Sequence, residues 1–185
     1  MAGTGTTAIL LAGGRGSRMN YQDKAWVIFA GRPMLMHVID HIKADVDQIL
    51  ISRNSTNTAY DDLPYQAIAD EMPGYQGPLA GLNSCSRYVK NTQVLVLPCD
   101  VPVLPTDLVS RLSTRLSGDS LVVAASGGRI QPLIFMTRAS ALDSIASYLE
   151  TGRRSVMGWL ETREITEEDF GPGEFVNVNE PSQLS

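Results

Sequence analysis

The stretch Ala8-Ile9-Leu10-Leu11-Ala12-Gly13-Gly14-Arg15-Gly16-Ser17-Arg18-Met19 joins an apolar run to a turn rich in glycine and arginine. The apolar run predicts a buried strand. The paired glycines permit a tight turn and a close approach to a ligand, because glycine has no Cβ. The N–H groups of such a loop can converge on phosphate oxygens, and Arg15, Arg18 and Lys24 add positive charge beside it. The stretch therefore predicts a loop that binds phosphate.

Two familiar phosphate-binding fingerprints do not fit this loop. The dinucleotide fingerprint G-x-G-x-x-G requires a third glycine for close packing of the helix on the strand, and Met19 occupies that position. The P-loop ends in a Gly-Lys pair, which the chain does not contain. A glycine-rich turn without any ligand is the remaining alternative. The basic residues beside the turn favour a ligand.

Length and composition indicate one globular domain, which we place at residues 1–185. The chain has 185 residues, of which 43% are hydrophobic and 19% are charged. Such values are typical of soluble proteins. No apolar run reaches the length of a membrane span, and the N-terminus lacks the basic segment of a secretory signal. We therefore expect a cytoplasmic protein with no membrane partner.

The net charge and the cysteine content argue against nucleic-acid binding, a disulfide framework and a structural zinc site. The net charge of −5 argues against broad binding of nucleic acid, which requires a basic face. An anionic small substrate is compatible with this charge if a local basic loop and a divalent cation offset it. Cys85 and Cys99, the two cysteines, are too few for a disulfide framework or a structural zinc site. We expect both to be reduced, partly buried thiols.

Apolar strands alternate with amphipathic helices along the chain. Strands are predicted at residues 48–52, 66–69 and 93–100, and a helix at residues 33–44. This alternation predicts an α/β fold with three αβα layers around a Rossmann-like, mostly parallel sheet. Ligands of such sheets gather at the carboxyl ends of the strands. Gly13, Asn54 and Asp70 each follow a predicted strand, so they are candidates for one site.

Asp100 ends the most apolar of these strands, and two prolines stiffen the chain just after it. A carboxylate at the tip of a rigid central strand is well placed to hold Mg²⁺. Magnesium is usually bound through one or two carboxylates together with the phosphates of a substrate. The alternative is an aspartate that only caps a turn. We expect Asp100 to be the metal ligand.

Four motifs carry a resemblance to a known family. They are Leu11-Ala12-Gly13-Gly14 with Arg18-Met19 and Lys24, Gly77-Pro78-Leu79-Ala80-Gly81, Cys99-Asp100-Val101-Pro102, and Val176-Asn177-Val178-Asn179. Together they resemble the molybdenum cofactor guanylyltransferase family, also called molybdopterin-guanine dinucleotide biosynthesis protein A. The resemblance covers nearly the whole chain and implies a nucleotidyltransferase fold of the glycosyltransferase-A-like type.

The resemblance implies a reaction and its substrates. Members of the family transfer GMP from GTP to molybdopterin that carries molybdenum, and they release pyrophosphate. Mg²⁺ is the implied cofactor, and GTP and Mo-molybdopterin are the implied small-molecule partners. Positioning and charge neutralisation carry such phosphoryl chemistry, so no covalent intermediate with the enzyme is expected.

The loop chemistry and the resemblance together suggest site residues. The expected catalytic residues are Arg18, Lys24 and Asp100. Contacts with GTP are expected from Leu11, Ala12, Gly13, Gly14, Lys24, Asn54, Asp70, Gly81 and Asp100. Contacts with molybdopterin are expected from Arg153, Arg154, Asn177 and Asn179. The alternatives are a solvated arginine pair and asparagines that orient a loop.

The sequence departs from the family at two places. Gln131 stands where the family usually has histidine, which leaves the role of that side chain open. Asn20 and Tyr21 follow the Arg-Met pair where the family commonly has glycine, so the loop is expected to be stiffer.

Other functions remain open. A CTP-dependent molybdopterin cytidylyltransferase or a sugar-phosphate nucleotidyltransferase would use the same fold, because the choice of base depends on a few loop contacts. A non-catalytic nucleotide-binding subunit that delivers the cofactor is an alternative of another class. The presence of both Lys24 and Asp100 favours an enzyme. Molybdoenzymes and cofactor-delivery proteins are the candidate protein partners.

Overall fold

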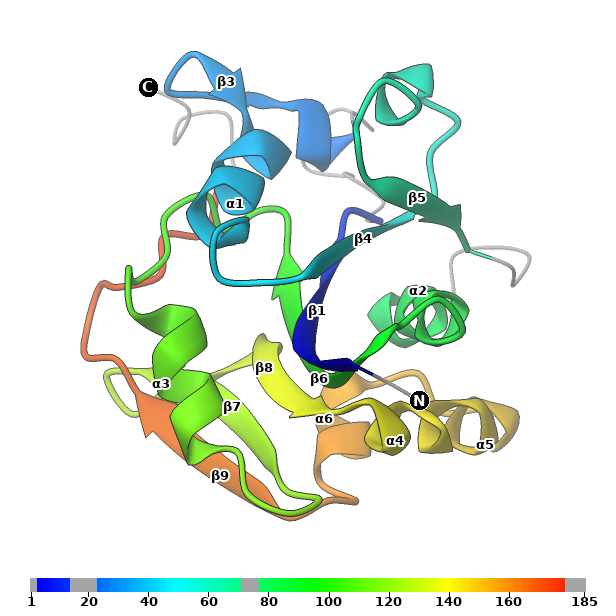
Figure 1. Cartoon of the computed structure of the whole chain (residues 1–185), viewed down its shortest axis with the longest axis vertical. Coiled ribbons are helices and arrows are strands. Elements are labelled where there is room, and N and C mark those ends of the chain that lie inside the picture. The colour runs from blue at the N-terminus through cyan, green and yellow to red at the C-terminus, as the bar shows by residue number, and fades with distance from the viewer. Residues whose placement is uncertain (1–2, 14–22, 71–76, 179–185) are drawn as a thin grey trace.

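The computed structural model describes residues 3–13, 23–70 and 77–178. Its centre is a seven-stranded sheet with the order β5-β4-β1-β6-β8-β7-β9 (Figure 1). The strands are β1 (Gly3–Leu11), β4 (Gln48–Arg53), β5 (Gln66–Ala69), β6 (Asn91–Pro98), β7 (Leu121–Ser126), β8 (Arg129–Arg138) and β9 (Ile165–Asp169). Strand β8 runs antiparallel to β6 and β7, whereas the pairings β1–β4, β1–β6, β4–β5 and β7–β9 are parallel. The predicted mostly parallel sheet is confirmed.

Helices cover both faces of this sheet. They are α1 (Met34–Ile42), α2 (Pro78–Ser86), α3 (Leu108–Arg115), α4 (Ala139–Leu142), α5 (Ser144–Glu150) and α6 (Val156–Leu160). Helices α1 and α3 pack on one face, and α2, α4, α5 and α6 pack on the other (Figure 1). The three-layer αβα architecture predicted from the alternating pattern is therefore confirmed.

Strand β1 lies at the centre because both of its faces are apolar. Ala8 and Leu10 belong to the core beneath α1 and α3, whereas Ile9 and Leu11 belong to the core beneath α2 and α5. Successive side chains of a strand point to opposite faces, so a strand buried on both sides needs an unbroken apolar run. The first apolar run of the sequence meets this requirement.

A short connection leads from the glycine-rich loop to α1. It contains the 3-10 helix η2 (Lys24–Trp26) and a hairpin of β2 (Ile28–Phe29) with β3 (Arg32–Pro33). The hairpin turn has positive φ at Ala30 (45°) and Gly31 (81°), as two-residue hairpin turns require. A second 3-10 helix, η3 (Thr58–Tyr60), lies between β4 and β5.

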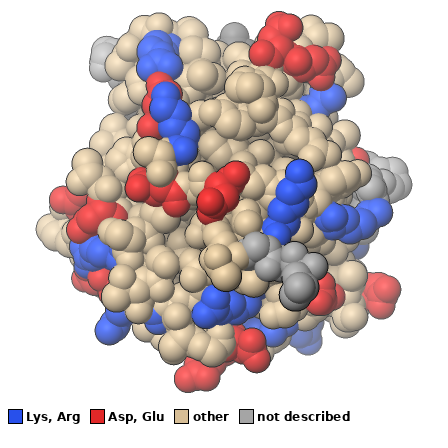
Figure 2. All heavy atoms as spheres, viewed as in Figure 1, with Lys and Arg blue, Asp and Glu red and all other residues tan. Residues whose placement is uncertain are grey.

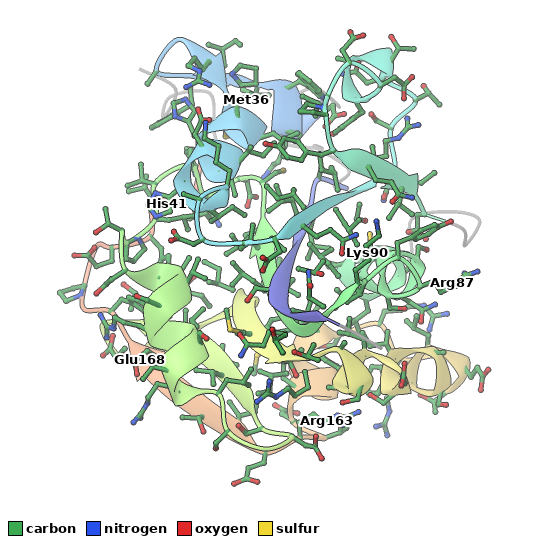
Figure 3. The ribbon with its side chains drawn as sticks, in the orientation of Figure 1. Met36, His41, Arg87, Lys90, Arg163 and Glu168 are labelled. Atoms are coloured by element: carbon green, nitrogen blue, oxygen red, sulfur yellow. The ribbon has the colours of Figure 1, made fainter. Side chains whose placement is uncertain are left out.

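The acidic segment 161–169, which its charge predicts to be a surface segment, contributes strand β9. Its backbone pairs in parallel with β7, with Ile165 opposite Leu121. An edge strand tolerates charged side chains because one of its sides faces solvent. Glu168 is held by Arg111 and Arg115 of α3, at 2.5 and 3.1 Å (Figure 3). The acidic composition of this segment therefore does not predict a strand. Pairing with β7 and the ion pairs with α3, both distant in sequence, stabilise it.

The distribution of surface charge and the character of the helices concern two classes of partner, nucleic acid and membrane. On the face shown in Figure 2, acidic and basic side chains are interspersed and do not gather into one basic surface. Among the described residues, no helix combines the length and the apolar character that crossing a lipid bilayer requires.

Candidate functional site

The order of the strands places a switch point between β1 and β6. From β1 the chain proceeds outward to β4 and then to β5, and it returns through α2 to β6 on the other side of β1 (Figure 1). Open α/β sheets bind ligands outside the carboxyl ends of the strands at such a point, because the connections diverge there and leave a crevice. The candidate site therefore lies beyond Leu11 of β1 and Pro98 of β6.

Four predicted site residues follow neighbouring strands at this edge. They are Gly13 after β1, Asn54 after β4, Asp70 after β5 and Asp100 after β6. Backbone hydrogen bonds continue beyond the strands and keep these ends aligned, from Ala12 N to Ser52 O at 2.9 Å, Asp70 N to Arg53 O at 3.1 Å and Cys99 N to Leu11 O at 3.2 Å. The structure thus brings residues from four segments to one edge of the sheet.

Gly13 lies directly against the side chain of Asn54. A Cβ added to Gly13 would meet Asn54 Oδ1 at 2.3 Å and its Cγ at 2.7 Å, closer than real Cβ contacts allow. Glycine is therefore needed here partly to admit the asparagine side chain, in addition to any approach of the backbone to a ligand. Asn54 itself remains exposed at the edge of the sheet.

Replacing Gly13 with alanine is expected to displace the Asn54 amide. If Asn54 binds the nucleotide, KM for GTP should rise by about tenfold, the cost of about one hydrogen bond. Asn54→Ala should raise this KM by a similar factor. Steady-state kinetics of both single variants and the double variant would measure the coupling. A double variant no worse than Asn54→Ala is expected, whereas additive effects would show that the new methyl group obstructs the nucleotide directly.

Lys24 and Asp100 form an ion pair at the switch point. Lys24 Nζ lies 3.2 Å from Asp100 Oδ2, and the two side chains are 18% and 20% exposed. Charge-assisted hydrogen bonds of this kind hold both partners in a defined geometry. The backbone of Asp100 is fixed as well, because its carbonyl oxygen accepts a bond of 2.8 Å from Val178 N. The predicted catalytic lysine and the predicted metal ligand are therefore neighbours.

The segment that follows Asp100 is anchored to α1. His41 of α1 donates from Nε2 to the carbonyl oxygen of Pro105 at 2.8 Å (Figure 3). A carbonyl oxygen can only accept, so the proton lies on Nε2. On its other side the segment pairs through a single bridge of Val103 with Val176. These contacts limit the movement of Asp100 relative to the sheet.

The donor set suits a cation that arrives with phosphate. Among residues 3–13, 23–70 and 77–178, no group of three or more His, Cys, Asp or Glu side chains could hold a metal ion. Asp100 supplies a carboxylate at the carboxyl end of β6. Magnesium is commonly bound in this way, through one or two carboxylates, water and the phosphates of the substrate. The residues present fit such an ion.

Cys99 precedes Asp100, but its thiol does not fit the role of a nucleophile. The side chain is buried, and burial raises the pKa of the thiol well above its ordinary value. Burial, with a smaller contribution from the charge of Asp70, raises the pKa of Cys85 to about 12. Both thiols are free and remain protonated at neutral pH, whereas nucleophilic attack requires the thiolate. The expectation of reduced thiols is confirmed, and both are fully buried.

Gly81 has a packing role that the sequence did not predict. It lies in α2, where an added Cβ would approach Ser52 Oγ of β4 to 2.0 Å. Glycine allows α2 to lie close to β4, just below the strand end that carries Asn54. Leu11 and Ala12 are also buried. Contacts of these three residues with GTP stay predictions.

The residues predicted to contact molybdopterin lie in two separate places in the fold. Arg154 donates from Nη1 to the carbonyl oxygens of Leu149 and Arg153, at 2.7 and 2.8 Å. Arg153 places its guanidinium 5.9 Å from the centre of the Tyr148 ring. Both guanidinium groups therefore lie at the C-terminal end of α5. A Cβ on Gly77 would lie 3.7 Å from the Arg154 carbonyl oxygen, so this segment adjoins the start of α2.

Asn177 lies on the opposite side of the switch point from Arg153 and Arg154. It is exposed, and the next residue, Val178, is fully buried against Val27 and Met34. Since Val178 N is bonded to Asp100 O, Asn177 lies close to the end of β6. Three further predicted residues, Gly14, Arg18 and Asn179, lie outside the described part of the chain.

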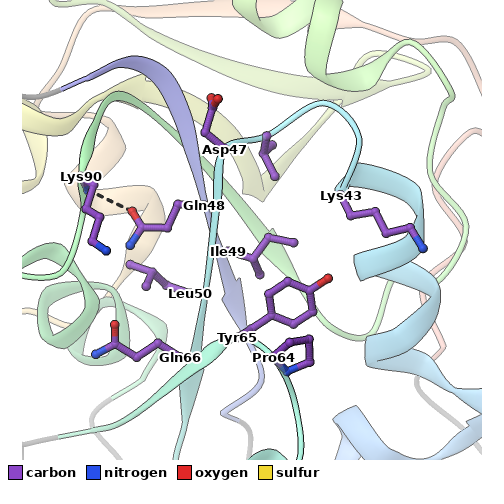
Figure 4. A pocket seen from close by; sticks show the side chains of 10 residues that line it. Lys43, Asp47, Gln48, Ile49, Leu50, Pro64, Tyr65, Gln66 and Lys90 are labelled. Atoms are coloured by element: carbon purple, nitrogen blue, oxygen red, sulfur yellow. Dashed lines mark hydrogen bonds between the residues drawn. The ribbon is translucent and has the colours of Figure 1, made fainter.

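A hollow on the described surface lies away from this edge. It has a volume of about 400 Å³ and is open to solvent, at the amino ends of β4 and β5 (Figure 4). Its lining includes Lys43, Tyr65 and Gln48, whose Oε1 accepts a bond of 3.0 Å from Lys90 N. This hollow is separate from the candidate site, because Gly13, Asn54 and Asp100 lie at the opposite ends of the strands.

Comparisons with known proteins show the family of the chain. Residues 8–165 match the model of the MobA-like NTP transferase domain. The chain belongs to the MobA-like NTP transferase family. It is 40% identical over 180 residues to the molybdenum cofactor guanylyltransferase of Shewanella sediminis, covering 95% of this chain and 92% of that protein. The protein of the same name from Shewanella woodyi is 39% identical over the same shares.

Solved structures show the same fold at low sequence identity. Molybdopterin-guanine dinucleotide biosynthesis protein A from Archaeoglobus fulgidus superimposes with a TM-score of 0.76 at 19% identity, over 96% of this chain and 94% of that one. The inositol-1-phosphate CTP transferase of T. maritima gives 0.80 at 13% identity, over 100% and 94%. The predicted nucleotidyltransferase fold is confirmed, and this MobA-like transferase is a nucleotidyltransferase.

Three residues of this MobA-like transferase were not found from the sequence. Asp23, Ser55 and Tyr60 are joined by hydrogen bonds next to Lys24. An aspartate before a short helix is a typical cap, which was the one local signal for Asp23. Ser55 and Tyr60 lie 32 and 37 residues further along, in a loop with no apolar period. No local pattern marks them as part of the site.

Proposed function

We propose that the protein transfers GMP from GTP to molybdenum-bearing molybdopterin, forming Mo-molybdopterin guanine dinucleotide and pyrophosphate. The observation that carries this proposal is the Lys24–Asp100 pair at the switch point of a MobA-like fold. The relatives that bear the name molybdenum cofactor guanylyltransferase match it over nearly their whole length. The ammonium of Lys24 and the carboxylate of Asp100 at this edge of the sheet suit chemistry on phosphates that arrive with a divalent cation.

In the proposed reaction the terminal phosphate of the pterin attacks the α-phosphorus of GTP. A bond forms between the pterin phosphate oxygen and this phosphorus, while the bond to the β-phosphate oxygen breaks and pyrophosphate leaves. The ammonium of Lys24 is placed to offset negative charge on the triphosphate and the leaving group. Asp100 would hold Mg²⁺, which neutralises phosphate charge when bound. Arg18 is the third proposed catalytic residue.

The two substrates are proposed to meet over the carboxyl ends of β1 and β6. GTP would lie on the side of Gly13, Asn54 and Asp70, which follow the neighbouring strands β1, β4 and β5. Leu11, Ala12, Gly14 and Gly81 complete the proposed GTP site. Molybdopterin would meet Asn177 and Asn179 on one side and Arg153 and Arg154 on the other. We propose that a single domain spanning residues 1–185 carries both sites.

Identification of the product by mass tests this function. Purified protein, Mg²⁺ and molybdenum-loaded molybdopterin would be incubated separately with GTP, CTP, ATP and UTP. A guanine dinucleotide with GTP alone, together with pyrophosphate, is the expected result. A cytosine dinucleotide would retain the mechanism and overturn the choice of base. No product from protein that still binds GTP would overturn the proposed acceptor, or favour a non-catalytic delivery subunit.

A further inference from the structure

The carboxylate of Asp23 is the acceptor of a hydrogen-bond network beside Lys24. Tyr60 donates its hydroxyl to both oxygens, at 3.0 Å to Oδ1 and 2.9 Å to Oδ2. Ser55 Oγ donates to Oδ2 at 2.6 Å, and the N–H of Ala25 donates to Oδ1 at 3.2 Å. Donors from the loop after β4 therefore hold an acidic side chain that belongs to the connection after β1.

Tyr60 is a rigid member of this network. Its side chain is 1% exposed. The ring of Trp26 meets it edge-on with centroids 5.3 Å apart, and the Arg53 guanidinium lies 5.7 Å from its centre. Burial, and then the negative charge of Asp23, raise the pKa of the Tyr60 phenol well above its ordinary range. The hydroxyl therefore stays protonated and remains a donor at physiological pH.

The helix that carries Lys24 is short, so the network that holds its first turn contributes to the position of Lys24. Helix η2 has three residues, and Asp23 is its N-cap. Short 3-10 helices have poor hydrogen-bond geometry and little stability of their own. The backbone bonds within η2, Trp26 N to Asp23 O at 3.0 Å and Val27 N to Lys24 O at 3.2 Å, begin at the capped end. Anchoring Asp23 to Ser55 and Tyr60 thus anchors the start of the Lys24 helix.

We propose that Asp23, held by Ser55 and Tyr60, is a positioning residue that keeps the Lys24 ammonium beside Asp100 for transfer of the nucleotidyl group. The proposal rests on the function proposed above, in which Lys24 offsets phosphate charge. It also gives the loop after β4 two tasks, because Asn54 faces the nucleotide site and the adjacent Ser55 holds Asp23.

Loss of the network should lower turnover with little effect on nucleotide binding. For Tyr60→Phe and for Ser55→Ala we expect kcat to fall by about tenfold, the effect of weakening one hydrogen bond to a charged group. KM for GTP should stay within about twofold, because neither hydroxyl is placed in the nucleotide site. Ser55→Thr keeps a hydroxyl and should restore the rate. Tyr65→Phe, in the hollow at the opposite ends of the strands, is the matched control (Figure 4).

The double variant Lys24→Ala/Tyr60→Phe separates positioning from general stability. If Tyr60 acts through Lys24, the double variant should turn over as slowly as Lys24→Ala and no more slowly. A further drop of about tenfold, as independent sites would give, would overturn the proposal. Thermal unfolding of each variant would show whether it is folded at the assay temperature, and Ser55→Ala tests the proposal should Tyr60→Phe fail to fold.

The reactivity of Lys24 can be measured in the absence of substrate. This measurement tests the positioning of Lys24 separately from the proposed function. The rate at which acetic anhydride acylates Lys24 would be followed by mass spectrometry of the peptide that contains it. In Tyr60→Phe and Ser55→Ala, this rate should rise by about fivefold or more as Lys24 leaves its partly buried pair, with no change in Tyr65→Phe. An unchanged rate in both variants would overturn the inference. A raised rate in a protein that makes no dinucleotide would support the positioning of Lys24 and overturn the proposed function alone.

Discussion

Asp100→Asn is expected to lower kcat by about 1000-fold, equivalent to about 4 kcal/mol of transition-state stabilisation. The substitution keeps the size of the side chain but removes the charge that would hold the divalent cation. The fold should persist, because the backbone bond from Val178 N to Asp100 O is retained. We expect the free energy of unfolding to change by about 1 kcal/mol or less, since the pair with Lys24 is partly exposed. Pyrophosphate release and thermal unfolding would measure the two effects.

Asp107→Asn is the matched control for this substitution. Asp107 lies in the same segment, is exposed, and has its carboxylate 3.7 Å from Arg111 Nη1. It should retain the full rate. The Asp100 variant should also require a higher Mg²⁺ concentration for its residual activity, because a neutral amide is a weaker ligand than a carboxylate. A normal rate with a normal Mg²⁺ requirement in Asp100→Asn would rule out Asp100 as the metal ligand.

Lys24→Ala is expected to lower kcat by about 100- to 1000-fold, the usual cost of removing one group that stabilises transition-state charge. Lys24 Nζ is held 3.2 Å from Asp100 Oδ2, so its charge acts from a defined position. Lys24→Arg should recover only part of the rate, because a planar guanidinium does not reproduce a compact ammonium at the same place. Steady-state kinetics with GTP varied at saturating Mg²⁺ would measure both variants.

Lys43→Ala is the control for the lysine. Lys43 is exposed at the end of α1, where its Nζ lies 2.7 Å from Asp40 Oδ1, and it should be dispensable for turnover. Raising the Mg²⁺ concentration should not rescue Lys24→Ala, in contrast to the metal-ligand variant. Recovery of Lys24→Ala at high Mg²⁺ would indicate that the lysine serves to hold the ion and not to neutralise phosphate.

The architecture follows from patterns that are local in the chain. Unbroken apolar runs predicted β1 and β6, because a strand buried on both faces permits no polar position. The prediction of the 66–69 strand agrees with β5, and the 33–44 helix with α1. The first and last residues of an element followed less closely from the local pattern than the presence of the element did. Helix α2 begins at Pro78, directly after Gly77, which takes a φ of 83°.

The carboxyl ends of the strands were also predictable, and with them the place of the site. Once the strands are parallel, residues that follow neighbouring strands meet at one edge. Gly13, Asn54 and Asp70 were grouped on this ground, and the structure brings them to that edge together with Asp100. The family motifs supplied the proposed chemistry, whereas the parallel sheet supplied the geometry.

Contacts between segments distant in sequence were decided by the tertiary structure alone. The charge of 161–169 predicted surface, but backbone pairing with β7 and the arginines of α3 made it β9. Asn54 against Gly13, and Ser55 and Tyr60 on Asp23, join residues more than thirty positions apart. The periodicity of apolar residues along the sequence indicates which side chains face the core. It does not indicate which side chain from a distant segment lies against them. The chain's own pattern therefore determined the central parallel strands and the edge that carries the candidate site, and only packing determined β9 and how Lys24 is held.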